Sequence, residues 1–385
     1  MKTVNIGIIG CGLMGREIAS AAARWCHLTD IDVRPELVAV CDTNEALLQW
    51  YTDNFAGIKQ AVTDYRQLLA NPDVDAVYCA VPHNLHEEFY TATIEAGKHL
   101  LGEKPFGIDM AANNAIMDCI ASHPDVLVRC SSQFPFFPAV QRIAGMIEEN
   151  AFGTVIQLET GFLHSSDLNP EKAINWKRMI DSNGEYGCMG DLGMHVCHVP
   201  FRAGWTPLTV RAVLSNIMTE RPDGKGGRVP CETWDNATLL CETRDPKSGS
   251  VFPWTMKTFR IAPGEMNTWY IHVYGTKCCA RFSTKNPKRL EWLEYDGSNQ
   301  NWQQLDIGYT PAFKAITGGI FEFGFSDALQ QMIAGFLYEV AHGEPVSNTA
   351  SCVTPEQAAL SHRLFTAALT SQKRQTTEPV HFTNS

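Results

Sequence analysis

Short apolar runs alternate with helical patterns through the first third of the chain. The runs VNIGIIG, ELVAVCD, AVYCAVP, HLLGEK and VLVRCSS are strand-like, and stretches such as NEALLQWYTDNF and DMAANNAIMDCIAS between them are helical. Parallel strands require crossover helices, so this alternation predicts an α/β domain with a doubly wound parallel sheet. We place this domain at residues 1–133.

The pattern changes after Gly153 to long β-rich runs, among them TVIQLETGFLH, TVRAVLSNIM and NTWYIHVYGTKCCARF, with turn signals between them. These runs predict a large, open, mostly antiparallel sheet. Two helical segments, SDALQQMIAGFLYEVAHGE and TPEQAALSHRLFTAALTSQ, follow near the C-terminus. We therefore expect residues 134–385 to form a second, α+β domain, and residues 221–230 (RPDGKGGRVP) to form a mobile surface loop.

The first strand leads directly into a glycine motif, Gly10-x-Gly12-x-x-Gly15, that opens a helix near Leu13 and Met14. Such a turn lets backbone N–H groups approach a pyrophosphate, which the start of the helix attracts. Asp42 ends the second strand, where a carboxylate accepts hydrogen bonds from ribose hydroxyls. No Arg or Lys follows it directly, so the sequence favours NAD over NADP.

Composition excludes several classes of protein. The 385 residues are 44% hydrophobic and 19% charged, which is typical of a soluble globular protein, and the length indicates two domains. A net charge of −11 argues against nucleic acid or an anionic membrane as partner. The 13 cysteines lack any C-x-x-C pair, and Arg16 and Glu17 interrupt the first apolar segment, so we expect reduced thiols, no export and a cytoplasmic protein.

Two polar motifs follow predicted strands of the first domain, at the sheet edge where ligands bind in such folds. Glu103, Lys104 and Pro105 follow the run HLL, and a lysine there can stabilise a developing alkoxide while Glu103 holds a ribose. Pro82, Asn84 and His86 follow another strand and are expected to border the cofactor. Asn84 is equally well placed to cap the next helix.

Asp191, His195 and His198 have the spacing i, i+4, i+7 of one helical face. Three interpretations fit this spacing. Asp191 and His195 form an acid/base dyad, the three residues bind a metal, or the histidines are structural. The residues alone leave these interpretations open.

Polar loops beside the predicted second sheet suit a sugar. His164 ends a strand, and Trp176, Lys177 and Arg178 precede the Asp191 segment. A tryptophan face packs against sugar C–H groups, and the charged groups bind hydroxyls. An ordinary polar loop with one packed tryptophan is an equally good interpretation.

These motifs occur together and in the order typical of one family. GIIGCGLMG, V-P-x-x-x-H at 81–86, E-K-P at 103–105, W-K-R at 176–178 and D-x-G-x-H at 191–195 resemble the glucose–fructose oxidoreductase/inositol dehydrogenase (Gfo/Idh/MocA) family. The resemblance implies a Rossmann domain, an open-sheet domain that mediates homodimers or homotetramers, and a C-terminal helix returning towards the Rossmann domain. It also implies a cis peptide bond between Lys104 and Pro105.

By this resemblance, Lys104, Asp191 and His195 are catalytic, with His195 as base, Asp191 orienting it and Lys104 stabilising the alkoxide. The expected activity is NAD-dependent hydride transfer at a ring hydroxyl of a sugar, glucoside or cyclitol, without a metal. The chain departs from the family at Tyr186 and His198, which are expected to line a differently shaped substrate pocket. Two alternatives are an NAD-dependent enzyme that cleaves glycosides by oxidation and elimination, and a non-catalytic dinucleotide sensor.

Overall fold

A computed structural model describes residues 1–307 and 311–381, which form two compact units. The first comprises Met1–Gly107, Ala111–Pro138 and the described part of Gly308–Pro355. The second comprises Ile108–Met110, Ala139–Ile307 and the described part of Glu356–Ser385. No helix in the described ranges is long and apolar enough to cross a membrane.

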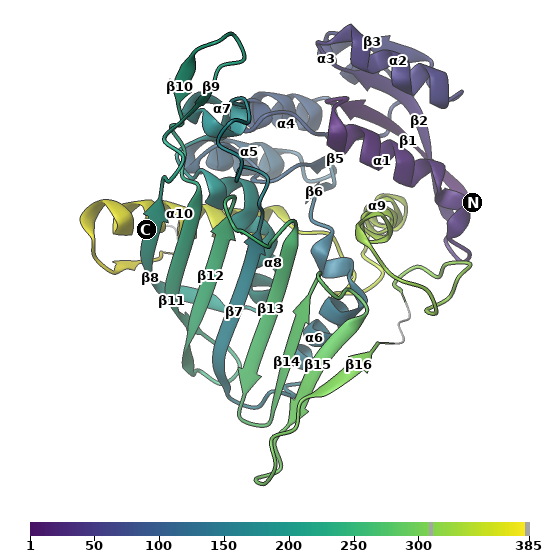
Figure 1. Ribbon diagram of the computed structural model, residues 1–385. Coiled ribbons are helices and arrows are strands. Elements are labelled where there is room, and N and C mark those ends of the chain that lie inside the picture. The colour runs from purple at the N-terminus through teal and green to yellow at the C-terminus, as the bar shows by residue number, and fades with distance from the viewer. Residues whose placement is uncertain (308–310, 382–385) are drawn as a thin grey trace. The chain divides into compact units, whose positions relative to one another are not determined.

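The first unit is built on a six-stranded parallel sheet with strand order β3-β2-β1-β4-β5-β6 (Figure 1). The order reverses between β1 and β4, and such a switch point is where dinucleotides bind in Rossmann folds. The strands are nearly continuous apolar runs because helices cover both faces. The predicted parallel, doubly wound sheet is confirmed.

The elements of this unit follow one another as strand and helix in the expected alternation. They are β1 Lys2–Ile9, α1 Leu13–Ala23, η1 Trp25–His27, β2 Val33–Cys41, α2 Glu45–Asn54, β3 Gln60–Val62, α3 Tyr65–Leu69, β4 Ala76–Cys79, η2 His83–Leu85, α4 His86–Glu95, β5 His99–Gly102, α5 Met110–Ser122, β6 Val128–Cys130, η3 Phe134–Phe136 and α9 Phe325–His342.

Helix α9 corrects the expected division of the chain, because the sequence analysis placed all of residues 134–385 in the second domain. The described residues of 311–355 belong instead to the first unit. Gln330 of α9 donates hydrogen bonds to the carbonyls of Ala21 and Arg24 at 3.2 and 2.7 Å, and Glu339 forms a buried ion pair with Arg129 of β6. The apolar helix thus buries its face against the Rossmann sheet, although more than 300 residues separate Gln330 from Ala21 along the chain.

The second unit is built on a nine-stranded sheet with order β16-β15-β14-β13-β7-β12-β11-β8-β17. Every neighbouring pair is antiparallel except β7 with β12, so the predicted large, mostly antiparallel sheet is confirmed (Figure 1). Burial alternates along the strands. In β13, Trp269, Ile271 and Val273 are buried, whereas Tyr270 and His272 between them remain partly exposed on the other face.

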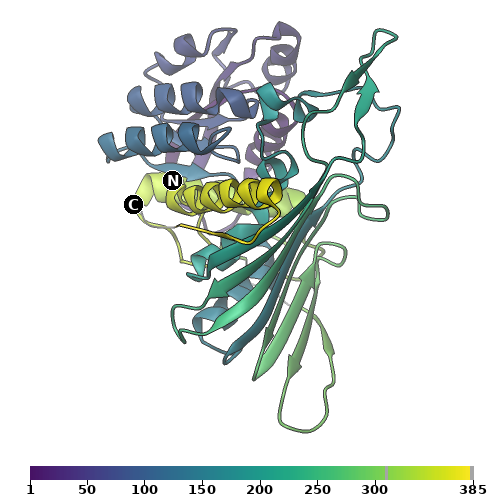
Figure 2. The same cartoon turned by 90° about the vertical axis from the view of Figure 1, so that its left-hand side faces the viewer.

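Helices and a small hairpin complete the second unit (Figure 2). Its elements are α6 Pro138–Glu148, β7 Val155–Leu163, η4 Trp176–Arg178, α7 Ile180–Asn183, the π-helical turn η5 Met189–Gly193, α8 Met194–Arg202, β8 Thr206–Ser215, β9 Glu220–Pro222, β10 Arg228–Pro230, β11 Asn236–Arg244, β12 Val251–Phe259, β13 Thr268–Gly275, β14 Cys278–Ser283, β15 Arg289–Glu294, β16 Gln303–Asp306, α10 Pro355–Arg374 and β17 Glu378–Pro379. The strands β9 and β10 occupy the ends of the segment that the sequence analysis expected to be a loop.

Candidate functional site

The glycine turn after β1 has the geometry that a pyrophosphate requires. Gly10 has a φ of +93°, and a Cβ there would lie 2.3 Å from the carbonyl oxygen of Ala80. A Cβ on Gly15 would lie 2.3 Å from the carbonyl oxygen of Gly10, so the third glycine lets helix α1 approach the turn closely. Among the described residues beyond its chain neighbours, none has an atom within 4 Å of a Cβ position on Gly12, which is also the N-cap of α1 and provides no capping side chain. The first N–H groups of this helix, at Leu13 and Met14, therefore suit an anion.

Asp42 lies directly beside this turn. One of its carboxylate oxygens accepts a hydrogen bond from the N–H of Cys11 at 2.8 Å, and the other accepts one from the N–H of Asn44 at 2.8 Å. Each oxygen keeps a lone pair for a further donor. The residue is partly exposed, so the turn and the carboxylate together fit a pyrophosphate and an adjoining ribose.

The Lys104–Pro105 peptide bond is cis, which confirms that prediction. The neighbouring Glu103 is only 8% exposed, and its carboxylate accepts a hydrogen bond of 2.6 Å from the hydroxyl of Tyr78. Burial and the Glu103 charge raise the pKa of the Tyr78 hydroxyl well above its ordinary value. Tyr90 donates to the Glu103 carbonyl at 2.6 Å, so two buried tyrosines fix the residue that precedes Lys104.

His86 has a structural position, which differs from the cofactor contact that the sequence analysis expected. It is fully buried and stacks on Tyr90, with ring centroids 4.7 Å apart. Its Nε2 lies 3.1 Å from the Val81 carbonyl oxygen, and its Nδ1 accepts a hydrogen bond from the N–H of Gly107 at 3.4 Å. The imidazole thus links the end of β4 to the loop that carries Lys104.

Pro82 and Asn84 lie at the short helix η2. Pro82 is its N-cap residue, and Asn84 is exposed within it. The N-cap of α4 is Leu85, which makes no side-chain cap, so the expectation that Asn84 caps that helix is wrong. The Asn84 amide is exposed, and its expected contact with the cofactor remains a proposal.

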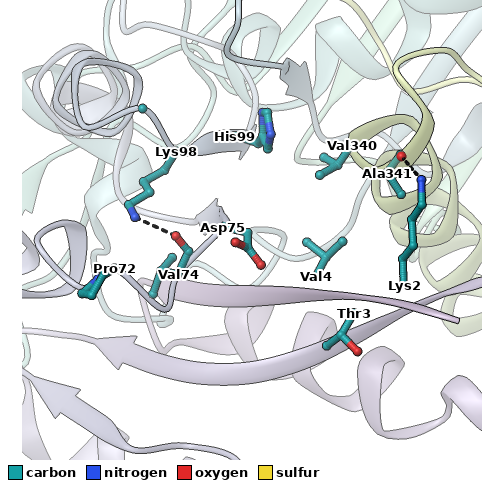
Figure 3. A pocket seen from close by; sticks show the side chains of 11 residues that line it. Lys2, Thr3, Val4, Pro72, Val74, Asp75, Lys98, His99, Val340 and Ala341 are labelled. Atoms are coloured by element: carbon teal, nitrogen blue, oxygen red, sulfur yellow. Dashed lines mark hydrogen bonds between the residues drawn. The ribbon is translucent and has the colours of Figure 1, made fainter.

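A hollow of about 420 Å³ in the first unit lies away from these residues (Figure 3). It is bordered by the amino ends of β1, β4 and β5, at Lys2, Asp75 and His99. Lys2 donates to the Ala341 carbonyl at 2.6 Å, and Lys98 donates to the Val74 carbonyl at 2.7 Å. Cofactors in this fold bind at the carboxyl ends of the strands, so this hollow is not the dinucleotide site.

In the second unit, Asp191 and His195 lie on the continuous helical segment formed by η5 and α8. The π-helical turn at Asp191 widens the spacing that the sequence analysis assumed, since a π turn holds more residues than an α turn. His195 is 7% exposed, with its ring 5.5 Å from that of Phe162. Its carbonyl accepts a hydrogen bond from the Trp269 indole at 2.9 Å, which fixes its backbone to β13.

Asp191 is ion-paired with two cations. The Lys177 ammonium lies 3.0 and 3.3 Å from its two oxygens, and the Arg260 guanidinium forms a buried pair with one of them. Arg260 also lies 3.8 Å from Asp167, which is 2.9 Å from Lys172. Arg260 therefore links the carboxylates of Asp167 and Asp191.

Arg260 was missed by the sequence analysis. It directly follows the apolar strand β12, so a charge at the end of a buried strand was the available signal.

Arg178 and Tyr186 are not pocket residues, contrary to expectation. Arg178 is fully buried and pairs with Asp235, while its other nitrogen lies 4.0 Å from Asp167. Tyr186 is 3% exposed, and its hydroxyl lies 2.8 Å from the Thr366 hydroxyl on α10. Both side chains therefore stabilise the interior of the second unit. The sequence patterns did not predict this, because they do not distinguish a buried side chain from one that binds a ligand.

His198 lies in the core of the second unit. It is fully buried, and neither ring nitrogen has a hydrogen-bond partner among the residues that the structure describes. Burial, and secondarily the nearby Arg202 charge, hold its pKa well below the ordinary value. A pocket-lining role for His198 is therefore not supported.

His164 and Trp176 are partly exposed, as binding residues must be. The ring of His164 lies 4.6 Å from that of Phe162, which is also the neighbour of His195. The Lys177 ammonium lies 5.6 Å from the centre of the Trp176 ring, and the Lys177 side chain is 35% exposed. A ring face and an ammonium are thus held side by side.

Metal ligation has no cluster to support it in the described ranges, where no group of three His, Cys, Asp or Glu side chains has suitable geometry. All thirteen cysteines are free, and most are buried. Burial raises the pKa of the Cys11 thiol, beside the glycine turn, to about 12. The Cys11 thiol is therefore protonated near neutral pH.

The Rossmann unit of the chain matches a known protein family. Residues 4–129 match the family GFO_IDH_MocA, described as an oxidoreductase family with an NAD-binding Rossmann fold. Over these residues the chain matches the Gfo/Idh/MocA oxidoreductase family. The predictions of the family, of an oxidoreductase and of NAD as cofactor are thereby confirmed at the level of the family.

Three relatives extend the comparison beyond the Rossmann unit. Levoglucosan dehydrogenase of Pseudarthrobacter phenanthrenivorans is 25% identical over 305 residues, covering 76% of each chain. An oxidoreductase domain protein from Kribbella flavida has a TM-score of 0.88 at 22% identity, covering 99% of this chain and 100% of that one. Levoglucosan dehydrogenase in complex with NADH and levoglucosan has a TM-score of 0.85 at 23% identity, covering 98% and 100%. The two structural likenesses confirm the fold class over the whole chain.

Proposed function

We propose that this protein is an NAD-dependent dehydrogenase that oxidises a ring hydroxyl of a sugar or a related cyclic polyol. The family is one of oxidoreductases, and one relative that spans three quarters of the chain is a levoglucosan dehydrogenase. The substrate class is transferred from that relative and agrees with the side chains of the second unit.

The residues of the glycine turn and Asp42 would hold the dinucleotide. NAD⁺, when bound, supplies the hydride acceptor. His195 is proposed as the base that takes the hydroxyl proton, because imidazole exchanges protons near neutral pH. Lys104 is proposed to stabilise the developing alkoxide by its charge.

Asp191 is proposed to act as a fixed anion beside this chemistry. Its ion pairs with Lys177 and Arg260 hold it in the charged form. It can then favour an imidazolium on His195 and hold Lys177 in place for a substrate hydroxyl. Trp176 and His164 would contribute a ring face and a further polar group.

The observation that carries the proposal is the arrangement of Lys177 with Asp191. Asp191 is 2% exposed, yet the side chain of its ammonium partner Lys177 is 35% exposed beside the partly exposed ring of Trp176. A buried anion that presents a cation next to an aromatic face is well suited to a polyhydroxylated ring.

The test is a screen of the purified protein with NAD⁺ against levoglucosan, aldoses, glucosides and cyclitols, followed by the absorbance of free NADH. We expect turnover with at least one of these compounds. Loss of a general base typically lowers a rate about 10²–10⁴-fold, and we expect a decrease of this size in the His195→Ala variant. The exposed His381, changed to Ala, is the control and should leave the rate unchanged. Release of an aglycone without accumulation of free NADH would support the glycoside-cleaving alternative instead.

We also propose that the chain forms a homodimer or homotetramer through the nine-stranded sheet. The apolar side chains of Ile156, Val213 and Leu240 on its strands are more than half exposed in the single chain. Sedimentation of the purified protein would test this, and a monomer at micromolar concentration would contradict it.

A further inference from the structure

Arg221 is a fully buried arginine at the base of the β9–β10 hairpin. In Figure 1 this hairpin extends beyond the ends of β8, β11 and β12. Its turn is exposed, and Asp223 accepts hydrogen bonds there from the N–H groups of Lys225 and Gly227. The exposed turn does not require a buried cation. The buried guanidinium of Arg221 must therefore be explained by its contacts outside the turn.

Within the described part of the chain, the guanidinium of Arg221 donates to one loop. It bonds the carbonyl oxygens of Asp167, Asn169 and Lys172, the last two at 2.8 and 3.3 Å. The N–H of Ile174 adds a backbone hydrogen bond of 2.8 Å to the carbonyl of Pro222. Four residues of the loop are therefore tied to the hairpin, and all lie between His164 and Trp176.

Ion pairs and hydrogen bonds of two aspartates also connect the ends of this loop and of the hairpin. Asp235, which follows the hairpin, pairs with Arg178 and accepts the N–H groups of Ile217 and Met218, which precede it. Asp167 within the loop lies 3.8 Å from Arg260, the partner of Asp191. The loop, the hairpin and the carboxylate of Asp191 thus form one connected set of buried polar contacts.

We propose that Arg221 is a positioning residue for the sugar, holding the loop 164–177 so that His164, Trp176 and Lys177 keep a fixed arrangement before the substrate binds. This inference rests on the proposed function. The guanidinium reaches the three carbonyls from two nitrogens held apart in one plane, whereas an ammonium with the same charge has a single nitrogen. Arg221→Lys therefore separates the geometry from the charge.

The first measurement is hydrogen exchange in the wild-type protein without sugar. The Ile174 amide and its neighbours in residues 165–175 should exchange slowly, as in a sheet strand, although the segment contains no strand. Exchange at the rate of an exposed loop would overturn the proposal without any variant.

The second measurement compares Arg221→Lys with Arg228→Lys on the neighbouring strand. In the described ranges, Arg228 pairs with Glu220 and with Glu171, which lies in the same loop, but both carboxylates are exposed. Exposed ion pairs contribute little, so this variant controls for a surface charge beside the loop. With levoglucosan as the probe, Arg221→Lys should raise the KM for the sugar about tenfold with little change in kcat or in the KM for NAD⁺, since misplaced binding groups weaken positioning. Arg228→Lys should change none of these.

Each further outcome decides the question. Faster exchange in residues 165–175 of Arg221→Lys with an unchanged KM for sugar would leave Arg221 a purely structural residue and overturn the proposal. Equal losses in the NAD⁺ and sugar KM values would also overturn it. If the wild type turns over no sugar in the screen, the proposed function fails and the substrate role falls with it, while hydrogen exchange still reports whether Arg221 holds the loop.

Discussion

At the scale of single residues, the two cations beside Asp191 decide what this carboxylate can do. Lys177 donates to both of its oxygens and Arg260 to one, in a position that is almost completely buried. Two cationic donors beside a buried carboxylate favour its ionised form, since protonation would remove the charge to which both cations are attracted. Asp191 is therefore suited to keep a permanent negative charge, whereas His195 is the better proton acceptor.

Asp42 should set the preference for the cofactor. Its carboxylate is fixed by the N–H groups of Cys11 and Asn44 and faces the glycine turn. Hydrogen bonds to a charged group contribute about 1.5–3 kcal/mol, so Asp42→Ala should lower kcat/KM for NAD⁺ about 10–100-fold. Removing the negative charge should also lessen the repulsion of a 2′-phosphate, so the loss with NADP⁺ should be smaller.

The control for this variant is Asp53→Ala, because Asp53 is an exposed carboxylate on α2 that bonds Gln49. Steady-state rates with both cofactors give the ratio directly. An unchanged NAD⁺/NADP⁺ ratio in Asp42→Ala would remove Asp42 from ribose recognition.

His198 should make the folded state sensitive to acid. Burial holds its pKa in the folded protein well below the ordinary value of 6.5, so the unfolded chain binds the proton first as pH falls. The free energy of unfolding should therefore decrease below pH 6.5, by up to about 2 kcal/mol at pH 5 from this group. Urea unfolding of wild type and His198→Leu at both pH values measures the difference.

The chain has twelve histidines, so the comparison rests on the variant. His198→Leu should lose less stability than wild type between pH 6.5 and 5, whereas His381→Gln, an exposed change, should behave as wild type does. Equal acid sensitivity of His198→Leu and wild type would show that His198 is not the group that titrates.

At the scale of elements, helix α9 is held to the Rossmann sheet by a buried ion pair. Arg129 of β6 and Glu339 of α9 have side-chain exposures of 19% and 3%. Arg129→Met would leave the Glu339 carboxylate buried without its partner and should cost about 3–5 kcal/mol of unfolding free energy. The double variant with Glu339→Met should recover most of this loss.

Urea unfolding measures these variants, and the exposed pair Arg66–Glu88 provides the control, whose disruption should change stability little. Losses that simply add in the double variant would contradict a coupled pair. They would also leave the attachment of α9 to its apolar contacts and to polar contacts such as those of Gln330.

The elements also show which features a sequence can predict. The glycine turn, Asp42 and the alternation of strands and helices depend on residues close together in the chain, so local patterns were sufficient. The return of residues 311–355 to the first unit depends on contacts such as Gln330 with Ala21, which have no local signal. Arg178, Tyr186 and His198 are buried, which residue type alone does not reveal. Arg260 carried a local signal, a charge directly after strand β12, that the sequence analysis did not use.

At the scale of the whole molecule, the two units divide the proposed chemistry between them. The first holds the glycine turn, Asp42 and Lys104, and the second holds Asp191, His195 and the loop with Trp176 and Lys177. The family match covers residues 4–129, whereas the side chains proposed to choose the substrate lie outside that range. Relatives of this fold can therefore share cofactor chemistry and differ in substrate.

The most direct test of the account follows the hydrogen itself. Levoglucosan deuterated at its ring carbons would be incubated with the protein and NAD⁺, and the reduced cofactor would be analysed by mass spectrometry and NMR. The account predicts one deuterium at the nicotinamide C4 for each sugar oxidised, with the signal lost in His195→Ala and retained in His381→Ala. Reduced cofactor without deuterium, or ketone formed without reduced cofactor, would contradict hydride transfer from a ring carbon.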